Sequence, residues 1–146
     1  MQLDNLNEVV LRSLEHERTG IEVYRTALRC AVTSELRDEW DQNLSRTVRN
    51  ERMLAEVCDV MDIDPDEETP DRQIVRQVGS FLVSAMREAL ENANPETAEL
   101  IACECVVVAE ARRYENAQPT MTGAVPTGRA WIAPQGCAAR RPQRAS

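Results

Sequence analysis

Apolar residues recur at alternating spacings of three and four through most of the first 116 residues, which is the period of a helix face rather than of a strand. Proline follows Thr69 and Asn94, and both of these polar residues are favoured N-caps ahead of a proline at the first helical position. These signals predict four helices, spanning about residues 4–32, 35–62, 70–93 and 95–116. Four amphipathic helices joined by short turns predict an all-α fold, a four-helix bundle.

The chain divides into two regions by composition. Its 146 residues suffice for one domain with its own core, and with only 3% aromatic residues the apolar content suits packed helices better than a sheet. Residues 117–146 contain no Asp or Glu, four of the seven prolines and three of the five glycines. We therefore expect a bundle over residues 1–116 and a disordered Ala/Pro/Gly/Arg-rich tail over residues 117–146.

Charge differs sharply between these regions. The bundle region carries 13 Arg against 25 acidic residues, a net of −12, whereas the tail carries four Arg and no acid. A bundle this acidic is a poor partner for nucleic acid or an anionic membrane, so we expect neither. A shifted GC-rich reading frame gives a mixture like the tail, so one hypothesis is a frameshift or sequence-end artefact that truncated the last helix. The other is a basic tether.

Cysteine usage and the N-terminal sequence indicate a cytoplasmic protein. Five scattered cysteines do not form a disulfide framework, and small buried thiols are expected. The first residues lack the basic and apolar segments of a signal peptide, and no run approaches the length of a membrane helix. The sequence also contains no Ser/His/Asp arrangement, P-loop or GxGxxG, so hydrolase and nucleotide-binding functions have no support.

Three glutamates occupy positions that helical periodicity assigns to the core. Glu104 is the only charged residue in the run 101–109, so a helix there is apolar on every side. Glu17 and Glu51 interrupt the apolar seams of the first two helices, and folding the chain about a turn near Thr33 places them only about 3 Å apart in height. Because a buried charge needs a partner, we predict that the three carboxylates are buried and share one polar cluster.

Inward glutamates at mid-height of a four-helix bundle are how diiron and dimanganese carboxylate proteins build their centres. Through residues 14–28 of the first helix and 103–110 of the fourth, the span 3–116 resembles the ferritin-like superfamily, near the bacterioferritin and rubrerythrin types. The resemblance implies that Glu17, Glu51 and Glu104 are ligands of iron or manganese. It implies binding of a divalent metal, without specifying an oxidase or storage activity.

The sequence departs from that family's pattern in two ways. The Glu-x-x-His pairs are absent because Leu54 and Val107 stand at the histidine positions, and the only histidine, His16, lies about 100° round the helix from Glu17. Ferritin-like folds also carry a long crossover between the second and third helices. Glu88 is expected as a fourth metal ligand only if that crossover is present, since a simple up-and-down turn leaves the third helix without one.

The alternative hypothesis is a metal-free helical interaction or assembly module. In it, arginines such as Arg25 or Arg49 hold the inward carboxylates, and the polar layer fixes the register of the helices. The bundle then forms a homo-oligomer, with the tail as a tether, and the metal content of the purified protein separates the two hypotheses. The remaining glutamates of note are expected at the surface, for Glu15, Glu22 and Glu39, or solvated or salt-bridged, for Glu110 and Glu115.

Overall fold

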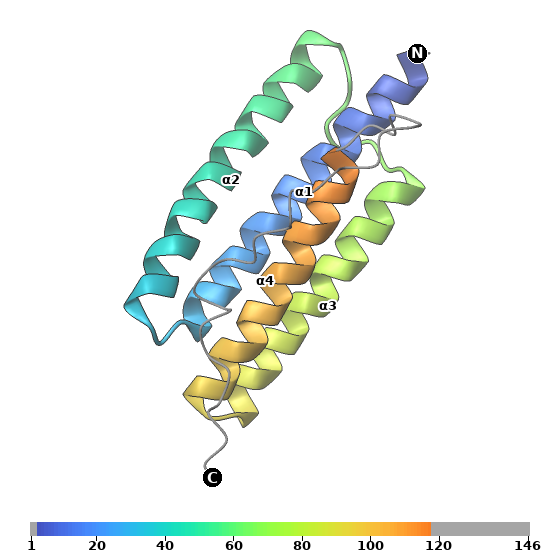
Figure 1. Cartoon of the computed structure of the whole chain (residues 1–146). Coiled ribbons are helices and arrows are strands. Elements are labelled where there is room, and N and C mark those ends of the chain that lie inside the picture. The colour runs from blue at the N-terminus through green and yellow to red at the C-terminus, as the bar shows by residue number, and fades with distance from the viewer. Residues whose placement is uncertain (1–2, 118–146) are drawn as a thin grey trace, which may run out of the picture.

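The computed structural model describes residues 3–117 as four helices, shown in Figure 1: α1 Leu3–Cys30, α2 Ser34–Val60, α3 Pro70–Asn92 and α4 Pro95–Ala117. The prediction of an all-α, four-helix fold is confirmed, and no strand occurs in this part of the chain. Every predicted boundary lies within a few residues of the observed one. The predicted tail lies outside the described residues apart from Ala117, which ends α4.

Local sequence fixes the starts of α3 and α4. The Thr69 hydroxyl accepts a hydrogen bond from the backbone N–H of Arg72 at 3.2 Å, and Pro70 takes the first helical position, where an N–H would have no helical partner. The side-chain oxygen of Asn94 accepts in the same way from the N–H of Thr97 at 2.9 Å. Both caps satisfy donors that a helix start otherwise leaves to water.

The end of α2 is set by a left-handed residue that is not glycine. Asp62 has φ of 56°, and the N–H of Ile63 donates to the carbonyl of Cys58 at 2.8 Å, the bond pattern of a Schellman motif. Ile63 is buried and packs in one cluster with Val10 and Leu11 of α1. The apolar contact therefore offsets the cost of the left-handed residue and turns the chain across the end of α1.

Helix α1 is the centre of the bundle. α2, α3 and α4 each pack along it, and α3 also packs on α4, whereas α2 has no extensive interface with α3 or α4 among residues 3–117. The chain reverses direction at each connection, so α1 and α3 run the same way (Figure 1). Of the two connections considered between α2 and α3, the structure therefore has the short up-and-down turn and not the long crossover. None of the described helices is long and apolar enough to span a membrane.

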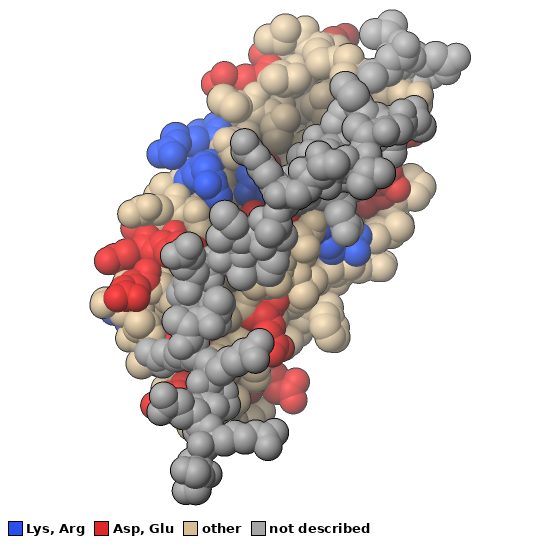
Figure 2. All heavy atoms as spheres, in the orientation of Figure 1, with Lys and Arg blue, Asp and Glu red and all other residues tan. Residues whose placement is uncertain are grey.

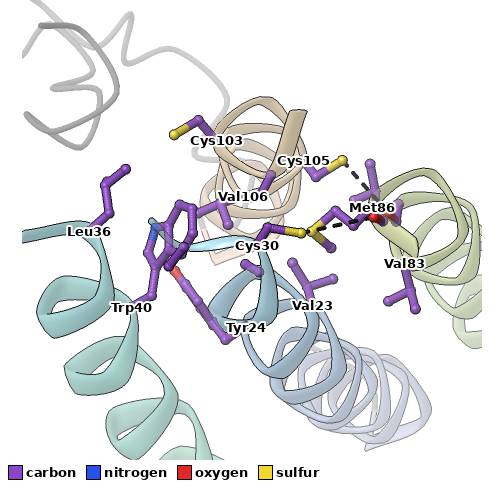
Figure 3. Packing of buried hydrophobic residues seen from close by; sticks show 14 residues of the cluster. Val23, Tyr24, Cys30, Leu36, Trp40, Val83, Met86, Cys103, Cys105 and Val106 are labelled. Carbon is purple, nitrogen blue, oxygen red and sulfur yellow. Dashed lines mark hydrogen bonds between the residues drawn. The ribbon is translucent and has the colours of Figure 1, made fainter. Parts of the chain in front are cut away.

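The main hydrophobic core lies between the four helices in the half of the bundle near the α1–α2 turn (Figure 3). Trp40 reaches from α2 toward Tyr24 of α1 and Val106 of α4, and its ring is fully buried. Met86 of α3 and the Cys30 thiol of α1 fill the opposite side, where the thiol lies 3.9 Å from the Met86 carbonyl oxygen. Through this one large side chain, α2 takes part in the core that α1, α3 and α4 share.

The described cysteines are free and buried, as expected for small core thiols. Cys105 Sγ lies 3.7 Å from the carbonyl oxygen of Leu82, and burial raises the pKa of the Cys30, Cys58 and Cys105 thiols above the ordinary range. A raised pKa keeps these groups protonated at neutral pH, so they act as small apolar side chains.

Helices α1 and α3 approach closely at Gly79. A Cβ added there would lie 1.9 Å from Cγ2 of Thr19, far inside any real contact. Glycine at this position therefore lets the α3 backbone sit directly against α1, and this close approach sets the height at which the two helices face each other.

Candidate functional site

The four glutamates predicted as metal ligands do not share one environment. Glu17 is buried, with 7% of its surface exposed, but Glu51 is only partly buried, and both Glu88 and Glu104 are exposed. The prediction was that Glu17, Glu51 and Glu104 are all buried in a single cluster. It is wrong for Glu104, which is exposed, and Glu51 is less buried than predicted.

The exposure of Glu104 has a simple geometric cause. Helix α4 packs through Ala98, Ala102 and Val106, and Glu104 lies about 200° round the helix from Ala102. The outer side of α4 faces solvent even where it is apolar, since Val108 is 43% exposed. A helix that is apolar on every side is thus still exposed to solvent on the side that faces no other helix.

The up-and-down topology places Glu88 away from the other predicted ligands. Arg76 of α3 contacts Glu15 of α1, and Glu88 follows twelve residues later, about 18 Å farther along the helix. It therefore lies far from the height of Glu17 and on the solvent side of α3. This placement follows the alternative in which the third helix supplies no ligand.

Glu17 belongs to a polar layer with Tyr24, Glu110 and Arg113, which we call the mid-bundle polar layer. The Arg113 guanidinium donates a short hydrogen bond to Glu17 Oε1 and lies 3.7 Å from Glu110 Oε1. The Tyr24 hydroxyl donates a short bond to the same oxygen of Glu110. Two carboxylates from α1 and α4 thus share one guanidinium.

Burial dominates the electrostatics of this layer. It raises the pKa of Glu17 above the ordinary range, although the charge of Arg113 and its hydrogen bond oppose the shift. The pKa of Tyr24 is also raised, by burial first and by the neighbouring charge of Glu110 second. The oxygen Glu17 Oε2 is buried without a hydrogen-bond partner in the described structure. This layer ties α1 to α4 through charge and hydrogen bonds.

Glu51 points to a different neighbourhood. Its carboxylate lies 3.4 Å from Nε of Arg18, whose guanidinium also bonds Asp66 in the α2–α3 connection at 3.0 Å. Burial alone lowers the pKa of Arg18, but the hydrogen bonds to these two acids outweigh it and raise the pKa. Arg18 and Arg113, rather than the predicted Arg25 and Arg49, are therefore the partners of the inward carboxylates. Arg25 instead pairs with exposed Glu22 one turn away.

A second buried cluster was missed by the sequence prediction, which placed Glu15 at the surface. Glu15 is 5% exposed and Arg72 is 1% exposed, and the two are joined by hydrogen bonds of 2.8 and 3.1 Å. Nη1 of Arg72 also donates to the carbonyls of Pro65 and Glu67, at 2.7 and 2.8 Å. Arg72 therefore ties the α2–α3 connection to α1. One signal was available: Glu15 lies on the face of Leu11, Thr19 and Val23, a second apolar stripe of α1.

Glu99 is the third buried acid and holds the other end of the bundle. Its Oε2 accepts hydrogen bonds from the backbone N–H groups of Val32 and Thr33, both at 2.6 Å, and its Oε1 accepts from the Thr33 hydroxyl at 2.8 Å. A carboxylate at the start of α2 accepts from backbone N–H groups that have no partner within a helix. It is also stabilised by the positive end of the helix dipole. Its role is to fix the α1–α2 turn against α4.

The geometry of these clusters bears on metal binding. Among the described side chains, those of residues 5–113, no three His, Cys, Asp or Glu are grouped so that they could hold a metal ion. The pKa of His16, the only histidine of the chain, is lowered to about 4 by burial and by nearby Arg112, Arg12 and Arg113. Arginines, not imidazoles, therefore surround the inward acids of α1.

A cleft of about 540 Å³ lies between α1 and α3, with Glu51 of α2 at its edge. Its charged lining consists of three Glu and three Arg, and these join as the pairs Arg18–Glu51, Arg25–Glu22 and Arg76–Glu15. Because each charge of the lining has an opposite neighbour, the cleft favours neither a cation nor an anion.

The chain matches no family model, no curated protein and no solved structure. Function is therefore inferred from the side chains that the bundle buries and from those that it leaves exposed.

Proposed function

We propose that this chain is a metal-free helical assembly module, a bundle that presents one helix face to another helical surface. The observation that carries the proposal is an apolar stripe on α2: Met53, Val57 and Val60 are 60%, 38% and 87% exposed. Their spacing of i, i+4 and i+7 puts them on one face of the helix. Because α2 has its one extensive interface with α1, this α2 stripe has no neighbour in the described bundle. Apolar surface gathered in this way is typical of an interaction site.

The same end of the bundle also exposes apolar residues of α1. Arg113 of α4 pairs with Glu17 of α1, and α4 is described only four residues farther, to Ala117. The N-terminal turns of α1 run past that point, and there Leu6 is 37% and Val9 41% exposed. The end of the bundle that holds the α2 stripe thus also exposes apolar side chains of the neighbouring helix.

The mid-bundle polar layer supports the metal-free part of the proposal. In a carboxylate metal centre, a cation neutralises acids from several helices. Here the Arg113 guanidinium contacts the carboxylates of Glu17 and Glu110 and supplies positive charge from within the chain. Buried acids that are paired in this way serve to fix the register of helices.

Divalent metal binding, the function implied by a ferritin-like resemblance, is the second candidate and is supported by one observation. Glu17 Oε2 is a buried carboxylate oxygen without a hydrogen-bond partner among the described residues. Iron or manganese bound there would take Glu17 and Glu110 as ligands and displace Arg113. Glu51, Glu88 and Glu104 would have to move to join it, since they lie in other environments.

The test of the assembly function is sedimentation velocity of the full chain, treated with a chelator, over a series of protein concentrations. We expect the sedimentation coefficient to rise with concentration and the rise to be lost in Met53→Glu. Phe81→Glu is the matched control, because Phe81 is 72% exposed on α3, away from the α2 stripe. A wild-type protein that stays monomeric throughout the series, or one that associates equally well with Met53→Glu, contradicts the proposal. Circular dichroism establishes that each variant is folded.

A further inference from the structure

We propose that the partner of the α2 stripe is a second copy of this chain, packed so that the two α2 helices run antiparallel about a twofold axis near Val57. The inference rests on the proposed assembly function and names its partner and register. It follows from the way in which charge is distributed along α2 and the connection after it.

The exposed charges of α2 are arranged in blocks. Arg46 and Arg49 are exposed and lie, at about 100° per residue, on or close to the face of the α2 stripe, about two to three turns before its centre at Val57. Figure 2 shows basic side chains gathered over the middle of α2 and acidic ones over its N-terminal end. Beyond the stripe the chain is acidic again, with exposed Asp62 and Asp64. The stripe therefore has a basic block on one side and an acidic block on the other.

This pattern is complementary to itself only in one orientation. A twofold axis near Val57 sets Met53 of one copy within about one residue of Val60 of the other, so each stripe covers its equivalent in an isologous interface. Arg49 lies eight residues, about 12 Å, from that axis, at the height where the other copy's α2 has ended and its acidic connection begins. Parallel helices would instead place Arg49 against Arg49, and like charges at an interface are unfavourable.

The antiparallel pairing also supplies what α2 lacks in the monomer. Each α2 would lie between its own α1 and the other copy's α2, which gives its outer face a helix to pack on. The exposed apolar residues of α3, Ile74 and Phe81, offer no comparable arrangement, because the exposed charge on their face is the acid Glu88 and no arginine block lies there to pair with it. Charge thus selects the α2 face and its orientation.

Disulfide trapping tests the register. The full chain carrying Cys137→Ser keeps only the four buried native thiols among its other cysteines. In that background we expect Val57→Cys to form a disulfide-linked dimer on mild oxidation, because a residue on a twofold axis meets its own copy. Phe81→Cys, equally accessible but on α3, is the matched control and should remain monomeric on non-reducing gels.

Charge gives an independent readout. We expect Arg49→Glu to weaken self-association about tenfold, and added salt to weaken the wild-type dimer, because opposite charges meet across the interface. If sedimentation shows self-association but Val57→Cys is not trapped, or salt strengthens the dimer, the antiparallel register is wrong while the assembly function stands. If the wild-type chain never self-associates, both this inference and the test of the assembly function fail.

Discussion

Replacement of Arg72 by methionine should destabilise the bundle more than any other single arginine substitution in the described helices. Arg72 is fully buried and donates four hydrogen bonds, two to Glu15 and two to backbone carbonyls of the α2–α3 connection. Methionine keeps much of the volume but leaves Pro65 and Glu67 carbonyls without this donor. The variant therefore tests whether one buried guanidinium holds the connection against α1.

The magnitude follows from the contacts that remain. Removing one partner of a buried ion pair costs about 3–5 kcal/mol, because the other charge is left uncompensated. Glu15 keeps a 3.1 Å contact with Arg76, so the lower end of that range applies, and we expect a loss of about 3 kcal/mol in the free energy of unfolding. For a helical region of this size that corresponds to a fall of about 12 °C in Tm.

Urea unfolding followed by circular dichroism measures the effect, and Arg76→Met is the matched control. Arg76 reaches the same carboxylate but is 47% exposed, so its removal should cost about 1 kcal/mol or less. Equal losses for Arg72→Met and Arg76→Met, within about 0.5 kcal/mol, would refute the argument that burial and the two carbonyl bonds make Arg72 special.

Two further predictions concern α1 and its contact with α3. His16 should titrate with a pKa of about 4, read from its single imidazole signal by NMR, and not near 6.5. The unfolded chain binds a proton between those values that the folded chain does not, so stability should fall as pH drops from 6.5 to about 4, and His16→Gln should lessen that fall. Gly79→Ala should lower the free energy of unfolding, measured by urea unfolding, by about 2 kcal/mol, since the added Cβ would lie 1.9 Å from Cγ2 of Thr19. Gly20→Ala, whose Cβ would have its nearest contact at 3.3 Å, should change stability much less, and the reverse order would contradict the close-approach argument.

Local signals in the sequence were sufficient to predict the helices and one inward acid. The caps at Thr69 and Asn94 depend on residues three positions apart, which can be read without knowing the fold. Glu17 was predicted correctly as buried because the seam of α1 is amphipathic and gives its direction clearly. Each of these features depends on one helix alone.

The rest of the candidate site depends on which helices become neighbours. Helix α4 is apolar on most sides, so its sequence does not reveal which side meets α1, and Glu104 was placed inward when Glu110 is the acid of that helix in the mid-bundle polar layer. The ion pair of Glu15 with Arg72 joins residues 57 positions apart, and neither has a local signal for the other. Helical period predicts a buried face, whereas the partner of each buried charge comes from tertiary packing.

The measurement that most directly tests the central claim is thermal unfolding of the chelator-treated protein over a series of Mn(II) or Fe(II) concentrations. If arginines already neutralise the buried acids, Tm should not change with metal and should rise with protein concentration, since only self-association then stabilises the native state. A Tm that rises with metal and loses that rise in Glu17→Gln, while staying independent of protein concentration, would contradict the account and establish the carboxylates as a metal site.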